Sequence, residues 1–139
     1  MISYNTVGVE MPPIDQPRVS AWVRQVAERY GKKAGDINFI FVSDEEILRI
    51  NREYIQHDYY TDHIGFDYSS GNVLSGDVFI GVETVASNAE LIGETYRREL
   101  HRVIIHGVLH LCGIKDKTPE LRMQMEAAEN AALALAVWL

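Results

Sequence analysis

The chain has 139 residues, 47% hydrophobic and 24% charged, which is the balance expected of a single globular domain over residues 1–139. The single cysteine excludes an intrachain disulfide, which fits a reducing cytoplasm. The sequence shows no basic start followed by an apolar stretch, so we expect no secretory signal and a cytoplasmic location. The longest apolar run, residues 131–139, is too short to cross a membrane. The net charge of −7 argues against nucleic acid as a partner, and no DNA is expected.

Hydrophobic periodicity and turn residues predict an alternation of strands and helices along the chain. A proline-rich loop is expected at residues 7–16, and a turn at residues 69–72 joins two strands into a hairpin. The predicted strands cover residues 1–5, 36–42, 63–68 and 73–82. The predicted helices cover residues 18–33, 43–56 and 83–92, a segment from 94 to about 112, and a last helix from 119 to the C-terminus. These elements predict an α+β domain with a single small mixed sheet of about four strands and about five helices.

The stretch from Glu99 to Pro119 carries the clearest chemical signal. His106 and His110 stand four residues apart on a predicted helix, so both imidazoles lie on one face and can reach one metal ion. Gly113 then ends the helix, and the reversal can return Asp116 to the same ion. Two histidines and one carboxylate with an open fourth position are typical of a catalytic zinc site. The sequence therefore predicts a metal site on a helix that is followed by a glycine turn.

The same helix has an apolar stripe on the side away from these histidines, formed by Leu100, Ile104, Val108 and Leu111. A helix buried in this way must give its histidines partners. The alternative to a metal site is two core histidines that bond to the backbone. Cys112 points away from the pair and is expected to be a small buried hydrophobe. Other histidines that could supply a fourth ligand are His57, His63 and His101.

From His106 to Asp116 the sequence reads H-G-V-L-H-L-C-G-I-K-D. This segment resembles the signature H-G-x-L-H-L-x-G-y-D-H of the YbeY family of bacterial endoribonucleases, which are also called ribosome-maturation factors. It departs from the signature at Ile114, Lys115 and Asp116, where the family has tyrosine, aspartate and a third histidine.

Upstream segments also resemble the family patterns N-x-x-Y-R, P-T-D-V-L-S-F and G-D-I. The matching residues are Asn51, Tyr54, Thr61, Asp62, Phe66, Gly76, Asp77 and Val78. Ile55 stands where the family has arginine, and Tyr60 stands where it has proline. The resemblance covers residues 51–117.

The resemblance implies a zinc-dependent, cytoplasmic endoribonuclease that is specific for single strands. It implies a role in maturation of the 3′ end of 16S rRNA and in ribosome quality control, with ribosomal RNA, the small ribosomal subunit and its assembly factors as partners. By position, His106, His110 and Asp116 become the zinc ligands and catalytic residues, with one Zn²⁺ per chain. A carboxylate oxygen is a competent zinc ligand in place of the third histidine.

Other polar residues are candidates for supporting roles. Because the arginine is missing at Ile55, another cation must contact phosphate, and Arg98 and Arg102 precede His106 on the same helix. The candidates for substrate binding are Arg98, Arg102 and Lys115, and those for orienting the ligands are Glu99, Asp62 and Asp77. Tyr59 and Tyr60 are candidates for stacking on bases. No general base is identifiable.

Three other functions compete with the nuclease. A metallopeptidase of the zincin type has a glutamate after its first histidine, and Gly107 stands there instead. A non-catalytic ribosome assembly factor would use zinc only to hold its fold, and Ile55 and Asp116 keep this alternative open. An iron oxygenase also uses two histidines and a carboxylate, but the ligand spacing and the absence of a barrel pattern disfavour it.

Overall fold

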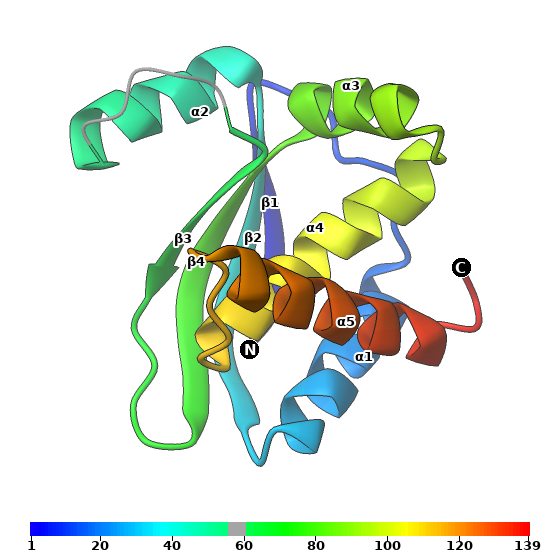
Figure 1. Cartoon of the computed structure of the whole chain (residues 1–139). Coiled ribbons are helices and arrows are strands. Elements are labelled where there is room, and N and C mark those ends of the chain that lie inside the picture. Colours follow the sequence, from blue (N-terminus) through cyan, green and yellow to red (C-terminus); the bar gives the residue numbers. More distant parts are fainter. Residues whose placement is uncertain (56–60) are drawn as a thin grey trace.

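The computed structural model describes residues 1–55 and 61–139, and in these ranges it confirms the predicted α+β fold of five α-helices and a four-stranded mixed sheet (Figure 1). The strands are β1 (Ile2–Val7), β2 (Lys33–Val42), β3 (His63–Asp67) and β4 (Val73–Gly81). The helices are α1 (Gln16–Arg29), α2 (Asp44–Ile50), α3 (Val82–Ile92), α4 (Tyr96–Leu111) and α5 (Pro119–Leu135). A π-helical turn, η1 (Asn51–Ile55), follows α2.

The sheet has the strand order β1-β2-β4-β3. The first three of these strands are parallel, and β3 is antiparallel to β4 because the predicted hairpin joins them. In that hairpin His63 pairs with Ile80, and Gly65 pairs with Val78. Side chains alternate between the two faces of a strand, so His63 lies on the same face as Ile80.

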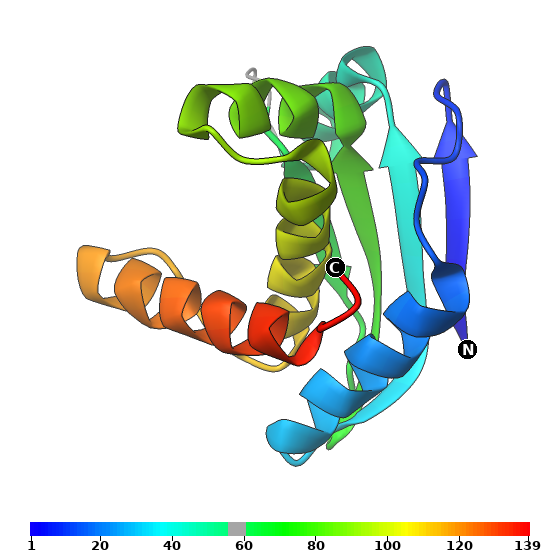
Figure 2. The same ribbon diagram turned by 90° about the vertical axis from the view of Figure 1, so that its right-hand side faces the viewer.

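Three helices cover that face of the sheet. Figure 2 shows α1, α4 and α5 on one side of the strands, and their apolar residues form the main core with β2 and β4. The other face is covered in part by α2, where Val42, Ile47, Ile50 and Ile64 form a second, smaller cluster. Helix α4, which carries His106 and His110, therefore packs directly against the sheet.

Helix α4 begins at Tyr96, two residues after the predicted start at residue 94, and residues at both ends explain its limits. The side chain of Thr95 caps its N-terminus by accepting a hydrogen bond from the backbone N–H of Arg98. Gly113 follows its end with a φ of 98°, a conformation that favours glycine. In the middle of the helix, a Cβ on Gly107 would lie 2.7 Å from Cγ1 of Val78 on β4. This close approach brings the helix against the strand and sets the depth of the site.

Some predicted boundaries are wrong by a few residues. The first helix ends at Arg29 and not at residue 33, because Gly31 turns the chain with a φ of 70° and Lys33 already pairs with Val73 in the sheet. The helix after Ser43 leaves α-helical geometry at Ile50 and continues as η1. The last helix ends at Leu135 and does not reach the C-terminus. Among the described residues, no helix combines the length and the apolar character that crossing a bilayer requires.

Candidate metal centre

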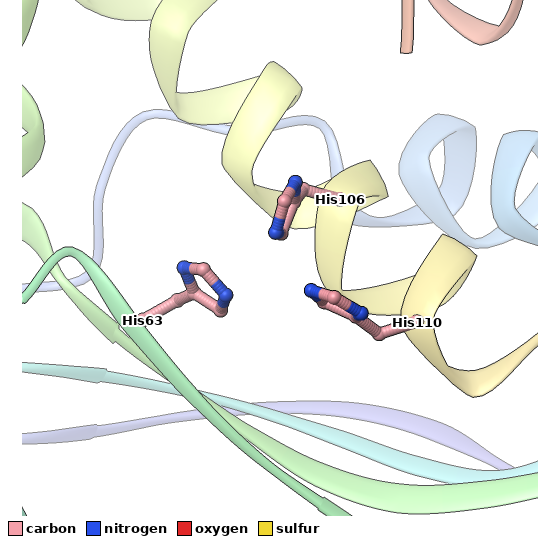
Figure 3. A group of neighbouring side chains, drawn as sticks. All are labelled: His63, His106 and His110. Carbon is pink, nitrogen blue, oxygen red and sulfur yellow. The ribbon is translucent and has the colours of Figure 1, made fainter. Parts of the chain in front are cut away.

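Three histidines from two elements meet beside the sheet. His106 and His110 come from α4, and His63 comes from the edge strand β3. One ligand atom from each ring lies within 4.8 Å of those of the other two, and Figure 3 shows the rings turned toward one another. These three side chains could hold a metal ion.

Each of the three rings has its Nδ1 atom paired with an oxygen acceptor. The pairs are His106 with Oε2 of Glu129 at 2.5 Å, His110 with the carbonyl of Ile114 at 3.0 Å, and His63 with Oδ1 of Asp62 at 2.7 Å. Carbonyl and carboxylate oxygens only accept, so Nδ1 carries the proton in each ring. A neutral ring then presents a bare Nε2, which is the arrangement that metal-binding histidines use.

The Nε2 atom of His106 provides a test of whether a metal ion fits. It is buried and has no hydrogen-bond partner among the described residues, although buried polar atoms are normally satisfied. Oδ2 of Asp116 lies 3.4 Å from this atom and 3.3 Å from Nε2 of His110. Two ligand atoms on a tetrahedral zinc ion are about 3.3 Å apart, given bonds of about 2.0 Å. The spacing of Asp116 from the two histidines therefore fits donors that share one metal ion such as zinc.

Behind His106 lies a buried network of charges. Glu129 is 4% exposed, and it accepts hydrogen bonds from Nδ1 of His106 and from Nη1 of Arg102, the latter at 2.9 Å. The other side of the Arg102 guanidinium donates to both oxygens of Glu99, at 2.8 and 2.5 Å. The network fixes the ring plane of His106, because Glu129 is itself held from behind.

The surrounding electrostatics favour the protonation states that a metal requires. Burial lowers the pKa of His110, and the nearby His106 lowers it further, which favours the neutral imidazole. Burial alone would raise the pKa of Glu129, but its bonds with His106 and Arg102 prevail and leave the pKa lowered. The same balance holds for Asp62: burial alone would raise its pKa, but the hydrogen bond from His63 and the electrostatic attraction of His63, Arg102 and His106 together leave it lowered. Both supporting carboxylates are therefore ionised acceptors at neutral pH.

The predicted supporting residues divide into those that reach the site and those that do not. Asp62 contacts His63 as an orienting carboxylate should. Glu99 reaches His106 only through Arg102 and Glu129, so its contact with the ligand is indirect.

Two of the predicted cations lie near the surface. Arg98 is about half exposed and pairs with Glu94, and Lys115 is exposed. The side chain of Ile55 and the residues His57, Tyr59 and Tyr60 lie outside the described part of the structure.

Asp77 is not brought to the histidines. Its neighbour Val78 contacts α4, and side chains alternate along β4, so Asp77 faces the opposite side of the sheet. There it accepts a hydrogen bond from Asn38 at 2.9 Å. The expectation that Asp77 supports the metal ligands is therefore not met by its position.

Two residues of the site were missed or undervalued. His63 was only one of three possible fourth ligands, since nothing local to β3 shows which strand pairs beside α4. Glu129 carried an available signal: it shares a face of α5 with Met125, Ala132 and Leu133, all buried. A glutamate on an apolar helix face needs a buried partner, and here that partner is His106.

The site opens into a cleft of about 390 Å³. It is lined by the end of α3, by α4, by Asp116 and by residues of α5 between Arg122 and Asn130. His106 and Asp116 form part of its wall, so a molecule in the cleft contacts the candidate metal centre directly.

The fold and the site define a small α+β domain with a histidine cluster that could bind a metal, open to a cleft. A family model for endoribonuclease YbeY matches residues 7–136. The chain is 60% identical to endoribonuclease YbeY of Phocaeicola vulgatus over 97% of its length and 98% of that protein, and 57% identical to that of Parabacteroides distasonis over 96% and 94%. The solution structure of TM1509 from Thermotoga maritima has a similar fold, with a TM-score of 0.64 and 24% identity over 96% of this chain and 90% of that one. The chain belongs to the YbeY family, and with it to the endoribonucleases, which act on RNA.

Proposed function

We propose that this protein is a zinc-dependent endoribonuclease specific for single-stranded RNA, acting in the cytoplasm. We further propose that it matures the 3′ end of 16S rRNA and serves ribosome quality control, together with the small ribosomal subunit and its assembly factors. Family membership supports the class of reaction. The observation that carries the metal dependence is the buried, unpartnered Nε2 of His106 within the three-histidine cluster.

In this proposal one zinc ion is held by His106 and His110 from α4, by His63 from β3 and by Asp116 from the loop after the helix. The histidines are fixed through their Nδ1 atoms, whereas among the described residues no hydrogen bond holds the carboxylate of Asp116 in this way. The carboxylate is therefore the donor that a water molecule or a phosphate oxygen can replace, which leaves the open position that a catalytic site needs. A bound zinc ion supplies Lewis acidity that lowers the pKa of a water molecule and stabilises negative charge developing on phosphate oxygens.

Residues of the chain orient the three imidazole rings. Asp62, Glu129 and the carbonyl of Ile114 keep the three Nδ1 protons in place, so each ring turns its lone pair inward. His106 is 8% exposed and lines the cleft, so a group of the RNA that occupies the cleft can reach the centre at this side chain.

The space around Gly107 argues against the alternative function as a metallopeptidase. A zincin requires a glutamate directly after the first histidine, but a Cβ at Gly107 would already lie 2.7 Å from a methyl carbon of Val78. Val78 is fully buried, so a longer side chain has no space there. The peptidase mechanism therefore has neither its base nor room for one.

One observation favours a second function, the non-catalytic assembly factor. Four protein donors converge here, and structural zinc sites normally have four. In that case the ion would hold β3, α4 and the following loop together without activating any group. The two functions differ in whether RNA is cleaved when the ion is bound.

The test compares zinc-loaded protein with a folded His110→Ala variant purified in parallel, on single-stranded and on structured fragments of ribosomal RNA. We expect cleavage of the single strands by the parent protein alone. Equal cleavage by both proteins would reveal a contaminating nuclease. Zinc bound to the parent without any cleavage would support the assembly factor.

A further inference from the structure

The cleft beside the histidines extends past them along α5. Its wall beyond His106 and Asp116 includes Arg102, Arg122 and Glu126. Its volume of about 390 Å³ lies within the range of sites that hold small molecules, and so has room for part of a nucleotide. The charges on this wall determine which part of a substrate it can hold.

The cations of the cleft differ in whether they are available. Arg102 is 31% exposed, but Glu99 and Glu129 occupy its guanidinium on both sides. Arg122 is exposed in the first turns of α5, and within residues 1–55 and 61–139 it forms no ion pair or hydrogen bond through its side chain. Glu126, one turn further along α5, is also exposed and lines the same cleft.

We propose that Arg122 is a phosphate-binding residue of the substrate site, and that it holds the RNA backbone at a phosphate next to the one that is cleaved. The inference rests on the proposed RNA-cleaving function and names the group that grips the substrate beside the metal centre. A guanidinium presents a planar fork of donors that matches two oxygens of a phosphate, and it remains charged at any relevant pH. Among the described residues that line the cleft, Arg122 is therefore a cation that remains available to a polyanion.

The carboxylates near Arg122 differ in whether they would repel a phosphate bound there. Glu129 is neutralised by Arg102 and His106, and Asp116 faces the metal position, so neither opposes a phosphate at Arg122. Glu126 has no such partner among the described residues and lies on the same wall. A phosphate at this place is thus attracted by Arg122 and repelled by Glu126, so the two side chains must act on RNA binding in opposite directions.

The assignment also answers which cation replaces the arginine missing at position 55. Arg98 pairs with Glu94, and Arg102 is held inside the network that fixes His106. Loss of Arg102 would therefore disturb the metal ligand as well as any substrate contact. Arg122 lines the cleft and bonds to neither a ligand nor a core residue, so it can be replaced without such damage.

The experiment measures binding of a short single-stranded RNA, made uncleavable by 2′-O-methyl groups, to the zinc-loaded protein at several salt concentrations. Arg122→Ala should weaken binding about tenfold and reduce the slope of log K against log salt by about 0.7, the share of one phosphate contact on a single strand. Glu126→Gln should strengthen binding, and Arg122→Lys should keep most of it. Arg24→Ala removes the same charge from an exposed position on α1 and should leave affinity and slope unchanged.

Zinc content and Tm are measured for every variant, and both should equal those of the parent protein. Unchanged affinity and slope in Arg122→Ala, or an equal loss in Arg24→Ala, would overturn the assignment while leaving cleavage by the parent protein intact. Conversely, a parent protein that binds RNA through Arg122 but never cleaves it would refute the proposed function and retain the phosphate site.

Discussion

His106 and Glu129 lie 23 residues apart in the sequence, yet their side chains meet at 2.5 Å in the buried wall of the site. The contact joins α4 to α5 and gives one candidate zinc ligand a fixed tautomer and ring plane. The contact also makes α5 part of the candidate metal centre, although none of the candidate ligands comes from α5. The orientation of the metal ligand thus depends on helix packing as well as on the motif.

We predict that Glu129→Gln weakens zinc binding about 10- to 100-fold, because carboxylates that orient a ligating histidine typically contribute that much to affinity. The amide keeps the shape of the side chain and removes the charge that bonds both His106 and Arg102. The measurement is competition with a chromophoric chelator at neutral pH.

The control for this prediction is Glu126→Gln, the same change on the same helix at an exposed position away from His106. It should leave zinc affinity unchanged. Equal zinc affinity in the Glu129 variant and the parent would show that the hydrogen bond does not support the metal centre.

A second prediction concerns His63 and Asp116, two of the residues in which this chain departs from the family patterns. The segment P-T-D-V-L-S-F has valine at the position of His63, and the signature H-G-x-L-H-L-x-G-y-D-H has histidine at that of Asp116. His63→Val should weaken zinc binding more than roughly tenfold, since it removes one of three clustered imidazoles. Adding Asp116→His to that variant should recover affinity, because it exchanges the carboxylate donor for an imidazole and so gives a set of three histidines at one ion.

The readout for this pair is the visible spectrum of the Co²⁺-substituted protein, which reports the ligands directly, together with zinc affinity. Failure of the second substitution to restore either quantity would mean that His63 and Asp116 do not act at the same ion. A His63→Val variant with full affinity would remove His63 from the ligand set.

Helix α4 sits so close to β4 that Gly107→Ala should lower the free energy of unfolding by about 1–3 kcal/mol, the usual cost of overpacking a core. The added methyl carbon would lie 2.7 Å from Cγ1 of Val78, which is fully buried and has no space to move. Urea denaturation measures the effect. Gly65→Ala is the control, because a Cβ there meets nothing within 4 Å, and an equal loss in both variants would refute the argument.

Burial raises the pKa of Cys112 to about 11, so its thiol stays protonated at pH 8. An unperturbed cysteine has a pKa near 8.5, so the thiolate fraction at pH 8 should be lower here on the order of a hundredfold. Alkylation by iodoacetamide at that pH should be correspondingly slow, and it should speed up in urea. Cys112 was expected to be buried and is only partly so, and rapid labelling of the folded protein would contradict its raised pKa.

The sequence predicted the part of the site that lies within one helix and its following turn. The spacing of His106 and His110 is set by helix geometry, and Gly113 marks the reversal that returns Asp116 to them. The strands and helices were also predictable, because apolar periodicity and capping residues are local. The end of the first helix was not, since Lys33 joins the sheet through a strand 40 residues away at Val73.

The rest of the site depends on contacts between distant segments. His63 reaches the cluster because β3 pairs with β4 in a register that places it opposite Ile80, on the face that α4 covers. Asp77 was predicted to lie at the site because this register is not visible in the sequence. In the structure, the register places Asp77 on the other face of the sheet. Neither outcome follows from local pattern, because shifting a strand by one residue exchanges its faces.

The most direct test of the account is a titration of metal-free protein with zinc, in which bound metal and cleavage of a single-stranded RNA are measured on the same samples. We predict that the cleavage rate rises in proportion to bound zinc and saturates at one ion per chain, and that a His106→Ala variant shows neither response. Full cleavage before zinc is added, or one tightly bound zinc per chain with no cleavage, would contradict the central claim that these histidines hold a catalytic metal.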